Sequence, residues 1–211
     1  MKKTNIFSLV VVLIILFASG LLFAQENTVD LRLEGKSDAV TYMNFIYAHN
    51  FGDTPWMAEV FHCRLPVEGA DDYYETTFGV GYNSLSVGDI AVYGLLHYSK
   101  AIDDNYAQPG LFALDVDGNW TGSLWAVYYV PLGDIGIEQI LVDPVEIQRT
   151  VYGSLSFGVS GYLWKPQGGE WLTRVGPKLS YLNKWGTSEI RLANENNGGG
   201  WQVQLRHVVL W

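Results

Sequence analysis

The last fourteen residues, GGGWQVQLRHVVLW (198–211), form a strand pattern with two unlike faces. Counting back from Trp211 in steps of two, the positions are apolar or aromatic as far as Trp201, with His207 as the exception, while the positions between them begin with Gln202. A period of two is typical of a β-strand whose faces meet different surroundings. Because soluble chains usually fray at their ends, a terminal strand that stops on a large aromatic residue indicates an apolar environment for one face.

The same rhythm recurs along the chain in runs of about ten residues, separated by clusters of Gly, Asp, Asn and Pro. The apolar faces of these runs are long for soluble strands, and Tyr and Trp stand near their ends, as they do at a membrane interface. A membrane-spanning strand needs about 9–11 residues, which most of the runs supply. The predicted strands are 39–50, 56–65, 72–83, 89–100, 107–116, 120–131, 149–164, 170–183, 186–194 and 200–211.

In lipid, every backbone N–H and C=O has to be paired internally, so a sheet has to join its own edges. The sequence therefore predicts an all-β fold, a closed antiparallel transmembrane β-barrel of about ten strands, within a range of 8–12. The segments NTVDLRLEG (27–35) and GIEQILV (136–142) could each supply another short strand. Residues 132–148 do not fit this scheme, because they would form a long connection at the periplasmic end, where turns are short. Either this segment folds into the lumen, or it contains two further strands, or the number of strands counted before it has the wrong parity.

The N-terminus predicts export. Lys2 and Lys3 precede a long apolar run that ends near Ala24, the pattern of a cleaved signal peptide, with a retained membrane anchor as the alternative. We therefore expect a signal peptide at 1–24, an N-terminal lead-in at 25–38 and the barrel at 39–211.

Composition excludes several classes of function. The 22 acidic residues outnumber the 13 basic ones, which argues against a nucleic-acid partner. A single cysteine, Cys63, permits neither an internal disulfide nor a metal site built on paired cysteines. No cofactor and no metal are predicted.

The final strand resembles the last strand of bacterial outer-membrane β-barrel proteins, which ends on an aromatic residue and alternates apolar positions before it. His207 departs from that pattern. The resemblance implies insertion into the outer membrane, with lipid as one partner and recognition of this strand by the barrel-assembly machinery. The expected interface anchors and assembly signal are Trp201, Val203, Leu205, Val209 and Trp211. The last forty residues, from Trp171 on, are also faintly similar to the closing hairpins of nucleoside-specific channel-forming barrels, from which no binding residues are carried over.

If the apolar faces point outward, the other faces line a lumen. The lumen candidates are Glu75, His97, Arg174, Lys178, Glu189, Arg191, Gln202, Gln204 and Arg206. One interpretation is that these charges pair with one another inside a filled barrel. The other is a basic strip on the last three strands that selects anionic or polar solutes.

We therefore expect a small porin-like channel for small polar solutes or a purely structural barrel. The alternative from a different class is a soluble secreted β-sandwich or barrel that binds carbohydrate through its many aromatic residues. A lipid-modifying or proteolytic barrel enzyme is the weakest hypothesis, because no catalytic motif is present and no catalytic residues are predicted.

Overall fold

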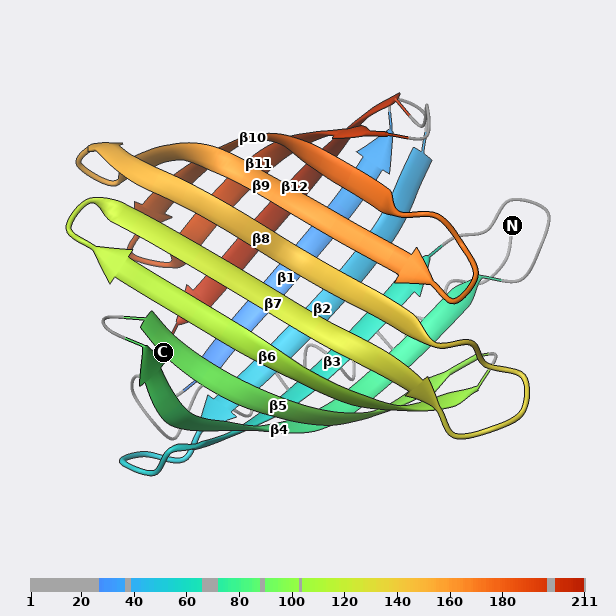
Figure 1. Cartoon of the computed structure of the whole chain (residues 1–211). Helices are drawn as coiled ribbons and strands as arrows, with labels where there is room; N and C mark the ends of the chain where they lie inside the picture. Colours follow the sequence, from blue (N-terminus) through green and yellow to red (C-terminus); the bar gives the residue numbers. More distant parts are fainter. Residues whose placement is uncertain are drawn as a thin grey trace.

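The computed structural model describes residues 27–36, 39–65, 72–87, 90–102, 104–196 and 200–210 (Figure 1). The expected signal peptide at 1–24 and the final residue, Trp211, lie outside this part of the chain. The described residues include no helix that is long and apolar enough to cross a membrane.

Within these ranges, twelve strands form one closed antiparallel barrel. Each strand pairs with its neighbours in sequence, and the last strand closes the ring by pairing with the first, with Leu33 opposite Leu205. The strands are β1 (Asn27–Lys36), β2 (Ala39–Asn50), β3 (Trp56–Leu65), β4 (Tyr73–Val87), β5 (Ile90–Ala101), β6 (Asn105–Asp117), β7 (Trp120–Pro131), β8 (Gln139–Tyr152), β9 (Leu155–Pro166), β10 (Leu172–Asn183), β11 (Gly186–Glu195) and β12 (Gly200–Leu210). The chain is thus an all-β closed barrel, but the expected number of about ten strands is wrong. The soluble sandwich is also excluded, since it needs two packed sheets and this sheet closes on itself.

The first of the two additional strands is β1, which lies in the segment expected to be a lead-in outside the barrel. It pairs with β2 along one edge and with β12 along the other. Asp30, Arg32 and Glu34 alternate along its buried face, while Leu31 and Leu33 are exposed on the other. In the sequence, three charges within five residues make this segment look polar. The residues that neutralise these charges lie on distant strands, so the sequence does not show that the segment is a strand.

The second additional strand arises because the strand expected at 149–164 is a hairpin of β8 and β9. The turn is formed by Gly153, whose φ is 52°, and Ser154. In a regular hairpin with a two-residue turn, the outward-facing residues are odd-numbered on one strand and even-numbered on the other. Here a register shift between Thr150 and Tyr152 cancels that change. Odd-numbered residues therefore face outward on both sides of the turn, so the alternation continues through the hairpin and conceals it.

The additional strand β8 also explains residues 132–148. Most of this segment belongs to β8, and only 132–138 connects β7 to β8. The described connections 51–55, 118–119, 153–154 and 184–185 share the end of the barrel where β12 finishes, at the left of Figure 1. The described connections 132–138 and 167–171 lie at the opposite end. The long connection thus lies away from the C-terminal end, and the conflict with short periplasmic turns disappears.

The distribution of polarity is the inverse of that in a soluble protein. Leu96, Phe78 and Ile147 are more than half exposed on the outside, at 59%, 55% and 53%, whereas Lys178 and Gln108 are 1% exposed inside. An exposed apolar surface that runs around a barrel needs an apolar solvent. The β-strands of 10–15 residues are long enough to cross a bilayer when tilted.

Aromatic side chains gather near both ends of the outer surface. Trp120 and Trp185 lie at the short-turn end, and Trp171 and Trp201 lie at the opposite end, all between 42% and 67% exposed. Basic groups stack on several of these rings: the Arg149 guanidinium lies 5.6 Å from the Trp120 ring centre. Amphipathic rings at two levels are typical of the two interfaces of a membrane.

Candidate functional site

The interior of the barrel is built from side chains on alternate positions of the strands, and its charged groups form ion pairs across several strands. Five basic side chains take part: Arg32 from β1, Arg174 and Lys178 from β10, Arg191 from β11 and Arg206 from β12. Each of them contacts at least two carboxylates. We call these contacts the interior ion pairs.

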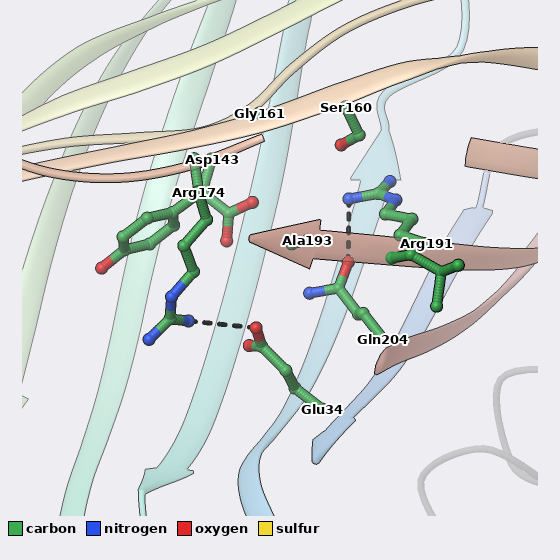
Figure 2. Close-up of a pocket in the computed structure, with 10 residues that line it drawn as sticks. Glu34, Asp143, Ser160, Gly161, Arg174, Arg191, Ala193 and Gln204 are labelled. Atoms are coloured by element: carbon green, nitrogen blue, oxygen red, sulfur yellow. Dashed lines mark hydrogen bonds and ion pairs between the residues drawn. The ribbon is translucent and has the colours of Figure 1, made fainter. Parts of the chain in front are cut away.

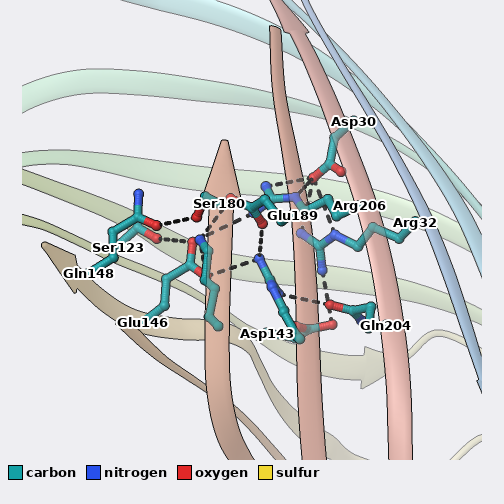
Figure 3. Close-up of polar contacts among 12 residues, drawn as sticks. Asp30, Arg32, Ser123, Asp143, Glu146, Gln148, Ser180, Glu189, Gln204 and Arg206 are labelled. Carbon is teal, nitrogen blue, oxygen red and sulfur yellow. Dashed lines mark hydrogen bonds and ion pairs between the residues drawn. The ribbon is translucent and has the colours of Figure 1, made fainter. Parts of the chain in front are cut away.

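Glu189 is the centre of the interior ion pairs (Figure 3). Its carboxylate lies 2.7 Å from Lys178 Nζ, 2.8 Å from Arg191 Nη2 and 3.2 Å from Arg206 Nη1. Glu146, on β8, provides a second carboxylate at 2.9 Å from both Lys178 and Arg191. Two carboxylates therefore share these cations. The positive charge of each base is neutralised by a neighbouring carboxylate and is not available to a solute.

A second set of ion pairs extends across the lumen. Arg206 Nη2 lies 2.7 Å from Asp30 Oδ2, and Arg32 Nη2 lies 3.1 Å from the same oxygen. Arg32 Nη1 then reaches Asp143 on β8 at 3.2 Å. Since β1 and β8 are five positions apart in the ring order β1-β12-β11-β10-β9-β8, the contact between Arg32 and Asp143 bridges walls of the barrel that are nearly opposite.

A polar cavity of about 30 Å³ lies between these walls (Figure 2). Arg174 borders it, held 3.0 Å from Glu34 and 2.9 Å from Glu195, with its guanidinium 5.1 Å from the ring centre of Tyr162. The volume is enough for one or two water molecules. The lining residues are Glu34, Asp143, Ser160, Gly161, Tyr162, Arg174, Arg191, Leu192, Ala193 and Gln204.

The wall formed by β4, β5, β6 and β7 carries an acid surrounded by neutral donors. Glu75 is 4% exposed, and its Oε1 accepts hydrogen bonds from Ser99 Oγ at 2.6 Å, Gln108 Nε2 at 2.7 Å and Thr77 Oγ1 at 3.1 Å. The Tyr73 hydroxyl donates to Oε2 at 3.2 Å. Among the described residues, no Lys or Arg forms an ion pair with Glu75. Neutral donors solvate this carboxylate without cancelling its charge.

His97 lies on the same wall, 3% exposed and stacked on Trp125 with 6.2 Å between ring centres. Neither ring nitrogen has a hydrogen-bond partner within the described part of the chain. The imidazole occupies the space above Gly79 on β4, where a Cβ atom would lie 1.7 Å from His97 Cδ2. The absence of a side chain at Gly79 is therefore what admits the ring.

The structure places all nine lumen candidates in the barrel interior or its ion pairs. Glu75, His97, Lys178, Glu189, Arg191, Gln202 and Gln204 are buried, and Arg174 and Arg206 are partly buried and ion-paired. Sequence reasoning missed Asp30, Arg32, Glu34, Glu59, Asp143 and Glu146. The alternation in DLRLE (30–34) was the available signal for the first three.

The expected anchors on β12 point outward where they are described. Trp201, Val203 and Leu205 are 61%, 44% and 49% exposed, and Val209 is partly buried. His207, the departure from the outer-membrane pattern, has its Nδ1 3.0 Å from the hydroxyl of Ser188 on β11. This contact gives the polar ring a partner within the sheet, as a lipid-facing surface requires. The role of the strand in assembly remains a prediction.

The described residues contain no group of three or more His, Cys, Asp or Glu side chains arranged to hold a metal ion. No protein-family model and no curated protein sequence matches the chain.

Solved structures of porins are similar in fold. The chain aligns with the KdgM porin at 14% identity, over 87% of this chain and 99% of that one, with a TM-score of 0.63. It aligns with the NanC porin at 11% identity, over 87% and 99% of the two chains, with a TM-score of 0.62. A structure of the KdgM porin in complex with disordered oligogalacturonate aligns at 15% identity, over 87% and 98%, with a TM-score of 0.60. At these identities the similarity shows a porin-like fold; both proteins are porins rather than enzymes.

Proposed function

We propose that this chain is a small channel of the bacterial outer membrane that passes small polar solutes by diffusion. The observation that carries the proposal is the inverted barrel: a closed ring of strands with an apolar outer surface and a charged, hydrogen-bonded interior. Such a ring satisfies its backbone within lipid, and it surrounds an interior in which polar solutes are stable.

The ends of the barrel support an orientation. Among the described connections, the end where β12 finishes carries three turns of two residues, at 118–119, 153–154 and 184–185, whereas the opposite end carries 132–138 and 167–171. Outer-membrane barrels have short periplasmic turns and longer extracellular loops. We therefore place the C-terminal end in the periplasm, where the assembly machinery would meet β12.

The interior supports a limit on the size of the solute. The bridge between Arg32 and Asp143 crosses the lumen and narrows it. The nine lumen candidates, from Glu75 to Arg206, would then form the polar lining along which a solute exchanges hydrogen bonds. The similar fold of the KdgM porin, whose structure has been solved with oligogalacturonate, supports polar solutes as the class.

A purely structural barrel is the second candidate, and the bridge between Arg32 and Asp143 is the observation that favours it. The two functions differ in one measurement. Purified protein should first be shown to be folded by a difference in gel mobility between unboiled and boiled samples, and located by partition with outer membranes. The folded protein is then inserted into planar bilayers and into vesicles that swell when a sugar enters.

Stepwise conductance, together with swelling that is fast for small sugars and slow for larger ones, is the result expected for a channel. A protein that is folded and outer-membrane-bound but neither conducts nor supports swelling would be a structural barrel. Recovery as a soluble periplasmic protein would contradict both.

A further inference from the structure

We propose that the channel selects against anions and favours cations and neutral solutes. The proposal rests on the channel function above and names the charge class of its solute. It reverses one of the two sequence interpretations, in which basic residues on the last strands attract anionic solutes, and it follows from how the interior charges are paired.

The first observation is that the interior bases are already neutralised. Lys178, the most deeply buried of them, lies 2.9 Å from Glu146 and 2.7 Å from Glu189. Arg174, which borders the cavity, lies 3.0 Å from Glu34 and 2.9 Å from Glu195. An entering carboxylate would have to displace a resident one from these cations, and separating a buried ion pair is costly.

The second observation is an excess of acid in the interior. Glu75 is 4% exposed and is held by neutral donors, and no described Lys or Arg forms an ion pair with it. The interior carboxylates that are ion-paired or solvated by donors on the described strands are Asp30, Glu34, Glu75, Asp143, Glu146, Glu189 and Glu195, and the interior cations are Arg32, Arg174, Lys178, Arg191 and Arg206. Seven carboxylates against five cations leave a formal charge of −2 on these side chains.

The described connections 132–138 and 167–171 carry acidic residues and no Lys or Arg, although Lys100 and Lys165 stand on the adjoining strand ends. Asp134 and Glu138 lie on the connection 132–138, Asp104 lies beside it, and Glu170 lies on the neighbouring connection 167–171. A low-dielectric wall concentrates the field of such charges along the axis, which raises the local concentration of cations and lowers that of anions. A polyanionic sugar would meet repulsion at both the mouth and the interior.

Reversal potentials in planar bilayers with a KCl gradient test this proposal. We expect K⁺ to be more permeable than Cl⁻ by a factor of about 2 or more, with the factor rising at low salt because screening is weaker. Glu75→Gln removes a charge that has no ion-pair partner among the described residues, and it keeps one oxygen to accept the hydrogen bonds of Ser99 and Gln108, so the permeability ratio should fall towards one without loss of the folded barrel. Arg174→Gln should change the ratio in the opposite direction, because it leaves Glu34 and Glu195 uncompensated.

Asp117→Asn is the matched control, since it also removes one negative charge but at the exposed end of β6, and it should leave the ratio unchanged. Preference for Cl⁻ in the wild-type protein, or a ratio that Glu75→Gln does not lower, overturns the selectivity while leaving a channel in place. A folded protein without conductance overturns the channel function itself, and the two failures are therefore distinguishable.

Discussion

Replacement of Glu189 by Gln is expected to destabilise the barrel measurably, because this one carboxylate contacts three cations. Gln has nearly the same shape, so the substitution removes charge with little change in packing. Lys178 and Arg191 each keep Glu146 at 2.9 Å, and Arg206 keeps Asp30 at 2.7 Å. Since every cation retains one carboxylate, we expect a loss near the lower end of the range for breaking a buried ion pair, about 3 kcal/mol.

The assay is urea-induced unfolding of the protein in lipid vesicles, followed by tryptophan fluorescence and by gel mobility of unboiled samples. A double-mutant cycle of Glu189→Gln with Lys178→Met isolates the pairwise contribution, and the two changes together should cost less than the sum of their separate effects by about 1–3 kcal/mol. Glu170→Gln, on an exposed connection, is the control and should stay within about 0.5 kcal/mol of the wild type. If Glu189→Gln is as stable as that control, the interior ion pairs do not hold the barrel together and the reasoning fails.

Two further predictions concern packing and pH. Gly79→Ala should destabilise the barrel by about 1–3 kcal/mol, because the new Cβ would lie 1.7 Å from His97 Cδ2, whereas Gly94→Ala, where nothing lies within 4 Å, should be neutral in the same unfolding assay. Hydrogen bonds from the backbone N–H of the following residue and from that of Gly136, at 2.8 Å, lower the pKa of Asp104 below its ordinary value of 3.8. A lowered pKa in the folded state means that the anchoring is present above about pH 3.8 and is lost as the pH falls further, so limited proteolysis of the β7–β8 connection should accelerate on acidification. Asp104→Asn should show the faster cleavage at neutral pH, and equal cleavage of both proteins at every pH would contradict the role of this carboxylate.

Much of the barrel could be predicted from local patterns, because each strand meets two different solvents. The strands expected at 39–50, 56–65 and 120–131 match β2, β3 and β7 residue for residue. Gly118 and Asn119 form a two-residue turn, and Asp117 pairs with Trp120 across it. Alternation of apolar and polar residues is a property of neighbouring positions, so it is available without any tertiary information.

Local patterns offered the segments 27–35 and 136–142 only as possible short strands and left β1 and β8 out of the ten-strand scheme. β1 looks polar because Asp30, Arg32 and Glu34 belong to the interior, and their compensating charges come from β8, β10 and β12. β8 was merged with β9 because a register shift near the Gly153 turn preserves the outward parity. For β1 the missing information is the identity of partners that are remote in the sequence. For β8 it is a backbone irregularity that leaves the alternation intact.

The sequence by itself determined that the chain is a closed all-β barrel with an apolar outside, because period-two alternation with long apolar faces has few other stable solutions. It also identified nine of the side chains that point inward, since strand geometry assigns alternate residues to opposite faces. Only the tertiary structure decided the number of strands and the electrostatic character of the interior. Arg174, Lys178 and Arg206 form a basic strip when their strands are considered alone, but ring closure brings Asp30, Glu34 and Glu146 against them. Charge is a long-range property of the assembled ring, and the sequence order of these residues does not reveal which of them meet.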